Sequence, residues 1–305
     1  MHSTKRKAGG GIDRDYYYDL SALFTSAAIS KALEKGFGSA EAQAICNSGL
    51  LDTVGEAASL SAMYDALYDE FAINYRCEYV YKNSIASQLL VQRHELSSTA
   101  MLSEFSIDNC LADVVILNST SSAYEIKTKL DSFERLKRQV SSYLKAFDLT
   151  YLVTHPSLMQ KAVRELIDYN SVGLIALSDD GGLIVEREAV SNADNVDPGK
   201  IFESFRRSEY EWIIKEEFGY VPDVPNTRIY KECCALFCEL DSRTAHGYMV
   251  EALKQRNNLQ HLADHLRNVP SCLHALWLTG KLSPKLAKLF PAKLNTSIAE
   301  FVFAS

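Results

Sequence analysis

Apolar residues recur every three or four positions along the first third of the chain, from Asp15 to about Ala72. This period predicts amphipathic helices, and Gly36 and Gly38 predict the end of the first of them. The same period predicts helices over residues 39–48, 59–71 and 83–96. Because no segment before about residue 100 shows a strand pattern, the N-terminal region is expected to be helical.

The pattern changes near Met101, where short β-rich runs begin to alternate with helical segments up to about Glu186. The predicted strands cover residues 102–107, 112–118, 123–128, 149–154, 173–177 and 183–185. A polar Ser-Thr-Ser-Ser segment separates the second run from the third and predicts a hairpin. Between Lys129 and Phe147 the period is helical again, and Asp131 with Glu134 resembles a capping box. This alternation is typical of an α/β unit.

Beyond Ala189 the chain returns to helical spacing after a predicted loop over residues 191–199. Several prolines, the first of them Pro222, predict breaks between the C-terminal helices. The expected organisation is a helical N-terminal region over residues 1–82, an α/β core over residues 83–190 and a helical C-terminal region over residues 191–305.

The composition narrows the class of protein. Of the 305 residues 47% are hydrophobic and 23% are charged, which is typical of a folded chain with a substantial core. No apolar run approaches the roughly 18 residues of a membrane span, so we expect a soluble, cytoplasmic protein without a membrane partner. Seven cysteines without a signal peptide predict free thiols.

The net charge of -7 argues against a protein that coats nucleic acid through bulk positive charge. It does not exclude a nuclease, because carboxylates that hold Mg²⁺ need only local basic patches around them. Residues 127–145 form one such patch, with Lys127, Lys129, Arg135, Lys137, Arg138 and Lys145. The patch has two interpretations, a solvated helix face and a surface that follows a phosphate backbone.

Three residues on the second and third predicted strands carry candidate chemistry. Asp113 opens an otherwise apolar strand, where an isolated carboxylate would be costly to bury. In the next strand Glu125 and Lys127 are two positions apart, so both side chains leave the same face. A hairpin brings these residues together. Two carboxylates beside a lysine form a site where a divalent metal can polarise a phosphodiester.

The Glu-x-Lys triplet alone is a weak signal, because about one is expected by chance in a chain of this size. A surface ion pair on a half-exposed strand would also explain it. The context strengthens the metal-site interpretation, since the triplet ends a predicted buried strand and a helix follows directly. That helix carries Gln139 and Tyr143 one turn apart, on a face that can be directed towards the site.

These residues resemble the PD-(D/E)XK nuclease superfamily, and Gln139-Val140-Ser141-Ser142-Tyr143 is similar to the Q-x3-Y motif of its RecB-like branch. The segments Tyr75–Asn83, Ala112–Asn118, Tyr124–Lys127 and Leu130–Leu136 are also similar to an uncharacterised bacterial family of that superfamily, which has helical flanks. The resemblance implies a restriction-endonuclease-like core, a mixed sheet in the order αβββαβ. The sequence departs from the pattern at Leu111, where relatives often have an arginine two positions before the aspartate.

The resemblance implies roles for individual residues. Asp113, Glu125 and the main-chain carbonyl of Ile126 would bind Mg²⁺ or Mn²⁺, and Lys127 would be the catalytic lysine. Gln139 and Tyr143 would support the geometry of metal or substrate. Glu104, one strand earlier, is a candidate for an additional ligand.

The expected function is therefore that of a Mg²⁺-dependent deoxyribonuclease, and family association favours a role in defence against foreign DNA. The expected partner is nucleic acid, foremost DNA, and the helical flanks are candidates for recruiting a protein partner. Two alternatives stay open. One is a nuclease-fold protein that binds nucleic acid or protein without cleaving, and the other is a toxin or effector that only a partner chain activates.

Overall fold

The structure is a computed structural model, and it describes residues 11–91, 96–256, 266–279 and 282–303. Its contacts divide the chain into two compact units. The first contains residues 1–83, 264–277 and 281–305, and the second contains residues 84–263 and 278–280. These units group the residues differently from the three sequence-based regions, because the end of the chain packs with the N-terminal helices. The Leu60 N–H donates to the Thr296 carbonyl at 2.9 Å, and the Phe37 N–H donates to the Phe301 carbonyl at 2.7 Å.

The first unit is helical, as its sequence predicts. Its N-terminal elements are η1 (Arg14–Tyr16), α1 (Tyr17–Ser21), η2 (Ala22–Phe24), α2 (Ser26–Lys35), α3 (Ser39–Asn47), α4 (Leu50–Val54) and α5 (Leu60–Asn74). The C-terminal elements are η7 (Leu266–Asn268), η8 (Ser271–Leu273), α14 (His274–Leu278), α15 (Pro284–Leu294) and α16 (Ala299–Val302). The helices predicted over residues 39–48 and 59–71 are confirmed as α3 and α5.

The helix predicted over residues 83–96 is only partly confirmed. Helix α6 (Glu78–Ser84) passes into η3 (Ile85–Val91), which has π-helical hydrogen bonding, and residues 92–95 lie outside the described part of the chain. Gln88 fixes η3 to the sheet of the second unit, because its side chain donates to the Gly181 carbonyl at 2.7 Å and accepts from the Leu183 N–H at 2.9 Å.

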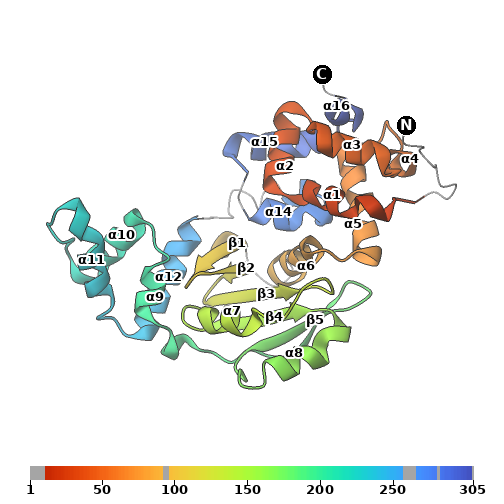
Figure 1. Cartoon of the computed structure of the whole chain (residues 1–305). Coiled ribbons are helices and arrows are strands. Elements are labelled where there is room, and N and C mark those ends of the chain that lie inside the picture. The colour runs from red at the N-terminus through yellow and green to blue at the C-terminus, as the bar shows by residue number, and fades with distance from the viewer. Residues whose placement is uncertain (1–10, 92–95, 257–265, 280–281, 304–305) are drawn as a thin grey trace. The chain divides into compact units, whose positions relative to one another are not determined.

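The second unit is built on a six-stranded mixed sheet in the order β1-β2-β3-β4-β5-β6 (Figure 1). All six predicted strands are confirmed, as β1 (Ala100–Ile107), β2 (Cys110–Leu117), β3 (Ser121–Lys127), β4 (Leu149–Thr154), β5 (Gly173–Leu177) and β6 (Leu183–Arg187). Strands β1, β2 and β3 are antiparallel neighbours, and the predicted hairpin joins β2 to β3. Strands β3, β4 and β5 are parallel, and β6 returns antiparallel. The chain is a mixed α/β protein.

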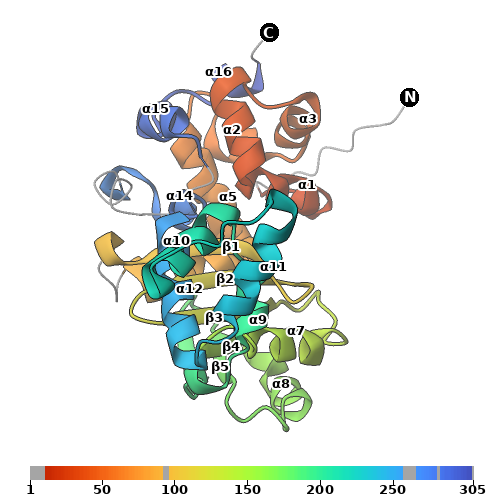
Figure 2. The same ribbon diagram turned by 90° about the vertical axis from the view of Figure 1, so that its left-hand side faces the viewer.

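The helices that follow β3, β4 and β6 cover one face of this sheet. They are α7 (Leu136–Tyr143) after β3, α8 (Met159–Glu165) after β4, and α9 (Pro198–Phe202), α10 (Arg207–Phe218), α11 (Asn226–Phe237) and α12 (Ser242–Arg256) after β6. Three short 3₁₀ turns lie between these elements: η4 (Leu96–Ser98) before β1, η5 (Pro156–Leu158) before α8 and η6 (Ala193–Asn195) before α9. Figure 2 shows α10, α11 and α12 in front of the strands, with α7 and α8 beside them.

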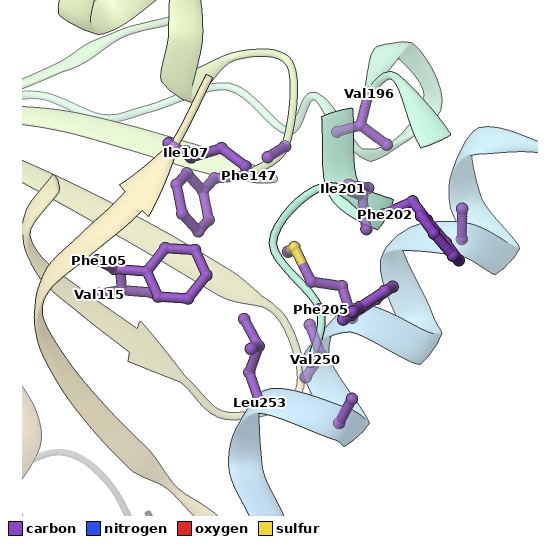
Figure 3. Packing of buried hydrophobic residues seen from close by; sticks show 14 of the residues in the cluster. Phe105, Ile107, Val115, Phe147, Val196, Ile201, Phe202, Phe205, Val250 and Leu253 are labelled. Atoms are coloured by element: carbon purple, nitrogen blue, oxygen red, sulfur yellow. The ribbon is translucent and has the colours of Figure 1, made fainter. Parts of the chain in front are cut away.

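Two hydrophobic clusters hold these helices to the sheet. The first joins β1, β2 and the end of α7 to helices α9–α12, and Figure 3 shows Phe105, Val115 and Phe147 facing Phe205 and Leu253 across it. The second cluster joins α7 and α8 to β4 and β5 through residues such as Leu136, Ala162 and Leu152. Helix α7 contributes to both clusters, so its position relative to β3 is fixed from two sides.

Helix α7 is shorter than its sequence predicts. The predicted helix covers residues 129–147, but the regular helix begins at Leu136, and no side chain caps its first turn. The capping-box prediction for Asp131 and Glu134 is wrong. The Asp131 carboxylate instead accepts hydrogen bonds from the Thr128 N–H at 2.8 Å and from the Thr128 hydroxyl at 2.7 Å. This local turn competes with helix formation, as short polar side chains often do.

A buried polar network joins the start of β3 and of β4 to the C-terminal helices. Asp148 accepts hydrogen bonds from the Ser191 and Thr120 hydroxyls and from the Asn192 and Ala193 N–H groups. Burial raises the pKa of the Asp148 carboxyl, but these hydrogen bonds outweigh burial and leave the pKa below its ordinary value. The Asp148 backbone N–H donates to the Ser121 hydroxyl, which also forms a hydrogen bond with the His246 ring on α12.

His246 should make folding stability depend on pH. Burial lowers the pKa of its ring below 6.5, an effect that the Asp148 carboxylate opposes and the Arg243 guanidinium reinforces. The His246 ring therefore binds a proton more readily in the unfolded chain than in the folded one. The contribution of the neutral ring to folding stability is complete above pH 6.5 and is lost as the pH falls below it. The free energy of unfolding, obtained from thermal unfolding across this window, should rise with pH by at most about 1.4 kcal/mol per pH unit. His246→Gln should remove this rise. An identical slope in the variant would contradict this assignment.

Candidate active site

The candidate site forms where β2 and β3 stop pairing through their main chains. Their ladder ends at the pair Val114 and Tyr124, and the next positions in the same register are Asp113 and Glu125. Instead of a further main-chain bond, the Asp113 carboxylate accepts the Ile126 N–H at 2.7 Å. Residues opposite each other in an antiparallel pair share a face. Asp113 and Glu125 therefore lie on the same side of the sheet, the side that α7 covers.

The end of the ladder also sets the direction of the Ile126 carbonyl. In a strand the N–H and the C=O of one residue point to the same side. Because the Ile126 N–H points to Asp113, the Ile126 carbonyl is directed to that side as well. The next carbonyl, of Lys127, points the opposite way and accepts the Thr154 hydroxyl of β4 at 2.6 Å. Two carboxylates and one main-chain carbonyl thus surround the point where β2 and β3 separate.

Glu125 and Lys127 form a buried ion pair on β3. The Lys127 ammonium lies 2.7 Å from one carboxylate oxygen of Glu125, and the two side chains are only 6% and 1% exposed. The same ammonium donates to the side-chain carbonyl of Gln139 on α7 at 3.1 Å. The lysine is therefore held between a charged and a neutral acceptor, with its nitrogen fixed by two different elements.

Tyr143 holds the other carboxylate oxygen of Glu125. Its hydroxyl lies 2.6 Å from that oxygen and 2.6 Å from the Leu111 carbonyl of β2. Burial, and then the negative charge of Glu125, raise the pKa of the Tyr143 phenol well above its ordinary value, so the phenol stays neutral. Its single proton is shared between the two acceptors. Tyr143 therefore ties the end of β2 to the carboxylate on β3.

The structure thus brings together all of the residues that the sequence singles out as catalytic. Asp113, Glu125 and Lys127 lie on one sheet face, and Gln139 and Tyr143 reach that face from successive turns of α7. Glu104, the candidate for an additional ligand, lies in β1 with an exposed side chain and a left-handed φ of 55°. Its role in a metal site stays a prediction.

Sequence reasoning missed one participant, the Leu111 carbonyl. In the sequence Leu111 is notable only because relatives often have an arginine at this position, and the Leu111 side chain is exposed. The contact with Tyr143 is made by the main chain, so no choice of residue type signals it. The loop that leads into α7 was also misread as helix, although its Thr128–Asp131 turn has the side chains that favour such turns.

The donors at this site are chemically suited to a hard divalent cation. Mg²⁺ prefers carboxylate and carbonyl oxygens, and each carboxylate oxygen of Glu125 has a second lone pair beside the one that Lys127 or Tyr143 uses. Over the described residues, no group of three or more His, Cys, Asp and Glu side chains is arranged to hold a metal. Only two such side chains are present here, and the third oxygen is that of the main chain.

A membrane span is not found among the helices of the described ranges, none of which is both long and apolar enough. Comparison with curated proteins gives no match. Among solved structures, the chain is similar to one described as "SPO1766 protein of unknown function from Silicibacter pomeroyi", with 15% identity and a TM-score of 0.30. The similarity covers 47% of this chain and 93% of that one.

A protein-family model described as "Bacteriophage P4 protein cII" matches residues 72–274. The matched range includes all six strands, helix α7 and every residue of the candidate site. Since it covers well over half of the 305 residues, the chain belongs to the bacteriophage P4 protein cII family.

Proposed function

We propose that this protein is a metal-dependent nuclease that hydrolyses DNA phosphodiester bonds on a PD-(D/E)XK-like core. The observation that carries the proposal is the buried pair of Glu125 and Lys127 beside Asp113, with Gln139 and Tyr143 fixing its two ends. The sequence resemblance to that superfamily supports the same assignment. The order of η3, strands β1 to β3, helix α7 and strand β4 agrees with the αβββαβ order that the resemblance implies.

Energetics favour a functional interpretation of this pair. Removing two charges from water costs several kcal/mol per ion, so a buried ion pair contributes little to stability compared with apolar side chains of the same volume. Burial of such a pair is therefore weak evidence for a purely structural role. Here the pair also ends a strand beside a second carboxylate, which a purely structural pair does not require.

Each residue has a separate task under this proposal. Asp113, Glu125 and the Ile126 carbonyl would hold Mg²⁺ or Mn²⁺. The bound cation would polarise the scissile phosphate and lower the pKa of water. The Lys127 ammonium would stabilise negative charge that develops at the reacting phosphate, because its nitrogen is already held in place. Gln139 would position that ammonium, and Tyr143 would position the Glu125 carboxylate.

One observation favours a second candidate, a nuclease-fold protein that binds nucleic acid or a protein without cleaving. Both carboxylate oxygens of Glu125 already have partners in Lys127 and Tyr143, so the network is satisfied without a cation. A protein that had lost catalysis would retain such a network because the loss of one partner would leave the other charge buried and unpaired. A role in defence against foreign DNA rests on the resemblance alone, and activation by a partner chain rests on the net charge of -7 and the long flanks.

The direct test is a cleavage assay with the purified full-length chain. Supercoiled, linear and single-stranded DNA, and RNA, are incubated with Mg²⁺, Mn²⁺ or EDTA. We expect DNA cleavage with either cation and none with EDTA, because catalysis depends on the metal. Binding of DNA without cleavage under every metal condition would favour the second candidate. Cleavage that persists in EDTA would contradict the proposed mechanism.

A further inference from the structure

Six exposed cations of the second unit lie on α7 and on the segments next to it, and none has a carboxylate partner among the described residues. They come from the loop before α7, from α7 itself and from α8: Lys129, Arg135, Lys137, Arg138, Lys161 and Arg164. We call this set the α7–α8 basic surface. In the described part of the chain none of the six makes an ion pair, and Lys161 instead lies 4.6 Å above the ring of Phe133. The acidic residues on the same segments are fewer: Asp131 and Glu134 are exposed, and Glu165 of α8 is half-buried. Asp168, also exposed, follows α8.

The two helices that carry these cations lie side by side. Leu136 and Val140 of α7 share a hydrophobic cluster with Ala162 of α8. The Ser141 hydroxyl of α7 lies 2.7 Å from the Tyr169 hydroxyl, which follows α8. The contact of Lys161 with Phe133 brings α8 to the loop that precedes α7. Cations more than 20 positions apart in the sequence therefore occupy one continuous surface.

Several cations elsewhere in the same unit are neutralised by carboxylates. On helices α9 to α12 and beside them the pairs are Lys200–Glu203, Arg207–Glu211, Arg228–Glu232, Arg243–Asp194 and Arg256–Glu209, whereas Lys215 and Lys231 have no carboxylate partner among the described residues. Lys145 at the end of α7 is likewise paired, with Asp108 at 2.6 Å. The basic stretch that the sequence shows over residues 127–145 is thus divided: Lys127 belongs to the site, Lys145 is neutralised, and the four cations between them keep their charge available.

We infer that the α7–α8 basic surface binds the phosphate backbone of DNA and directs it to the candidate site. Lys161 and Arg164 are like charges three positions apart on α8, an arrangement that slightly destabilises a helix. Cations without a carboxylate partner are suited to phosphates, whose binding releases counterions. Arg138 directly precedes Gln139, which contacts Lys127, so α7 carries both part of this surface and a residue of the candidate site. This inference rests on the proposed function and adds α8 to the substrate path.

The test is a binding measurement in EDTA, which separates binding from cleavage. Fluorescence anisotropy of a labelled duplex of about 20 base pairs is measured against salt concentration for the full-length chain. One variant carries Lys137→Gln and Arg138→Gln on α7, and another carries Lys161→Gln and Arg164→Gln on α8. The matched control carries Lys215→Gln and Lys231→Gln, two exposed lysines on α10 and α11 that also have no carboxylate partner among the described residues.

Each of the two variants on the surface should bind roughly tenfold or more weakly near 0.1 M salt, and its salt slope should fall by about 2, because two phosphate contacts are lost. The control should keep the slope of the original protein. An unchanged slope for the α8 variant would overturn the inference. Binding of polyglutamate in place of the duplex would overturn it too and would assign the surface to an acidic protein. If both surface variants lower the salt slope of DNA binding but the original protein does not cleave DNA in Mg²⁺, the surface binds DNA as inferred. Only the proposed nuclease activity would then be rejected.

Discussion

Asp113→Asn should abolish metal-dependent DNA cleavage while leaving the fold intact. Asparagine keeps an oxygen that can accept the Ile126 N–H, which Asp113 accepts at 2.7 Å, so the end of the β2–β3 ladder is preserved. It removes the negative charge that would bind the cation. Losing that ligand should cost several kcal/mol of transition-state stabilisation, a fall of about 10³-fold or more in turnover.

Turnover and thermal stability are measured on the same preparation of the Asp113→Asn variant. The unfolding free energy should change by about 1 kcal/mol or less, because one hydrogen bond to a charged acceptor becomes a bond to a neutral one. Asp223→Asn, at an exposed aspartate between α10 and α11, makes the same change in charge away from the site and should leave turnover unchanged. Full activity in Asp113→Asn with normal stability would remove Asp113 from the metal site and would contradict the proposed mechanism.

The strands of the second unit could be predicted from sequence because their signal is local. Each of the six runs is short and rich in β-branched or apolar residues, and polar turns separate them. The position of Asp113 relative to Glu125 follows from the same local information, since one hairpin joins their strands. That Lys127 shares the face of Glu125 follows from the two-residue period of a strand.

The features that the sequence did not reveal depend on contacts between distant segments. No local sequence pattern indicates that residues 266–277 and 282–303 pack with the N-terminal helices, because main-chain hydrogen bonds such as that from Leu60 to Thr296 bring them there. The contact of α8 with α7 is likewise tertiary, so Lys161 had no apparent connection with Arg138. The start of α7 was misplaced for another reason, since Asp131 favours both a helix cap and the turn that it forms with Thr128.

The sequence predicts that β3 is buried, but it does not reveal the direct contact between the Lys127 ammonium and the Glu125 carboxylate. This contact leads to the second large effect that we expect. Lys127→Met should lower the free energy of unfolding by about 3–5 kcal/mol, because it leaves the Glu125 carboxylate buried without a counter-charge. Glu125→Gln should also destabilise the fold, since the ammonium would then face only neutral acceptors. The double variant removes both charges and should recover most of the lost stability, which gives a coupling energy of about 2 kcal/mol or more.

This cycle separates the structural role of the pair from its catalytic role. The double variant should fold nearly as stably as the original chain and still cleave no DNA, because both the metal ligand and the cation for the reacting phosphate are absent. The matched control is Arg228 and Glu232, an exposed pair on α11, where Arg228→Met with Glu232→Gln should show a coupling of about 0.5 kcal/mol or less. Chemical denaturation gives the four stabilities, and the cleavage assay gives the four rates. A stable double variant that cleaves DNA at the original rate would show that the pair serves only the fold. A double variant whose loss of stability equals the sum of the two single losses would show that the two charges do not interact.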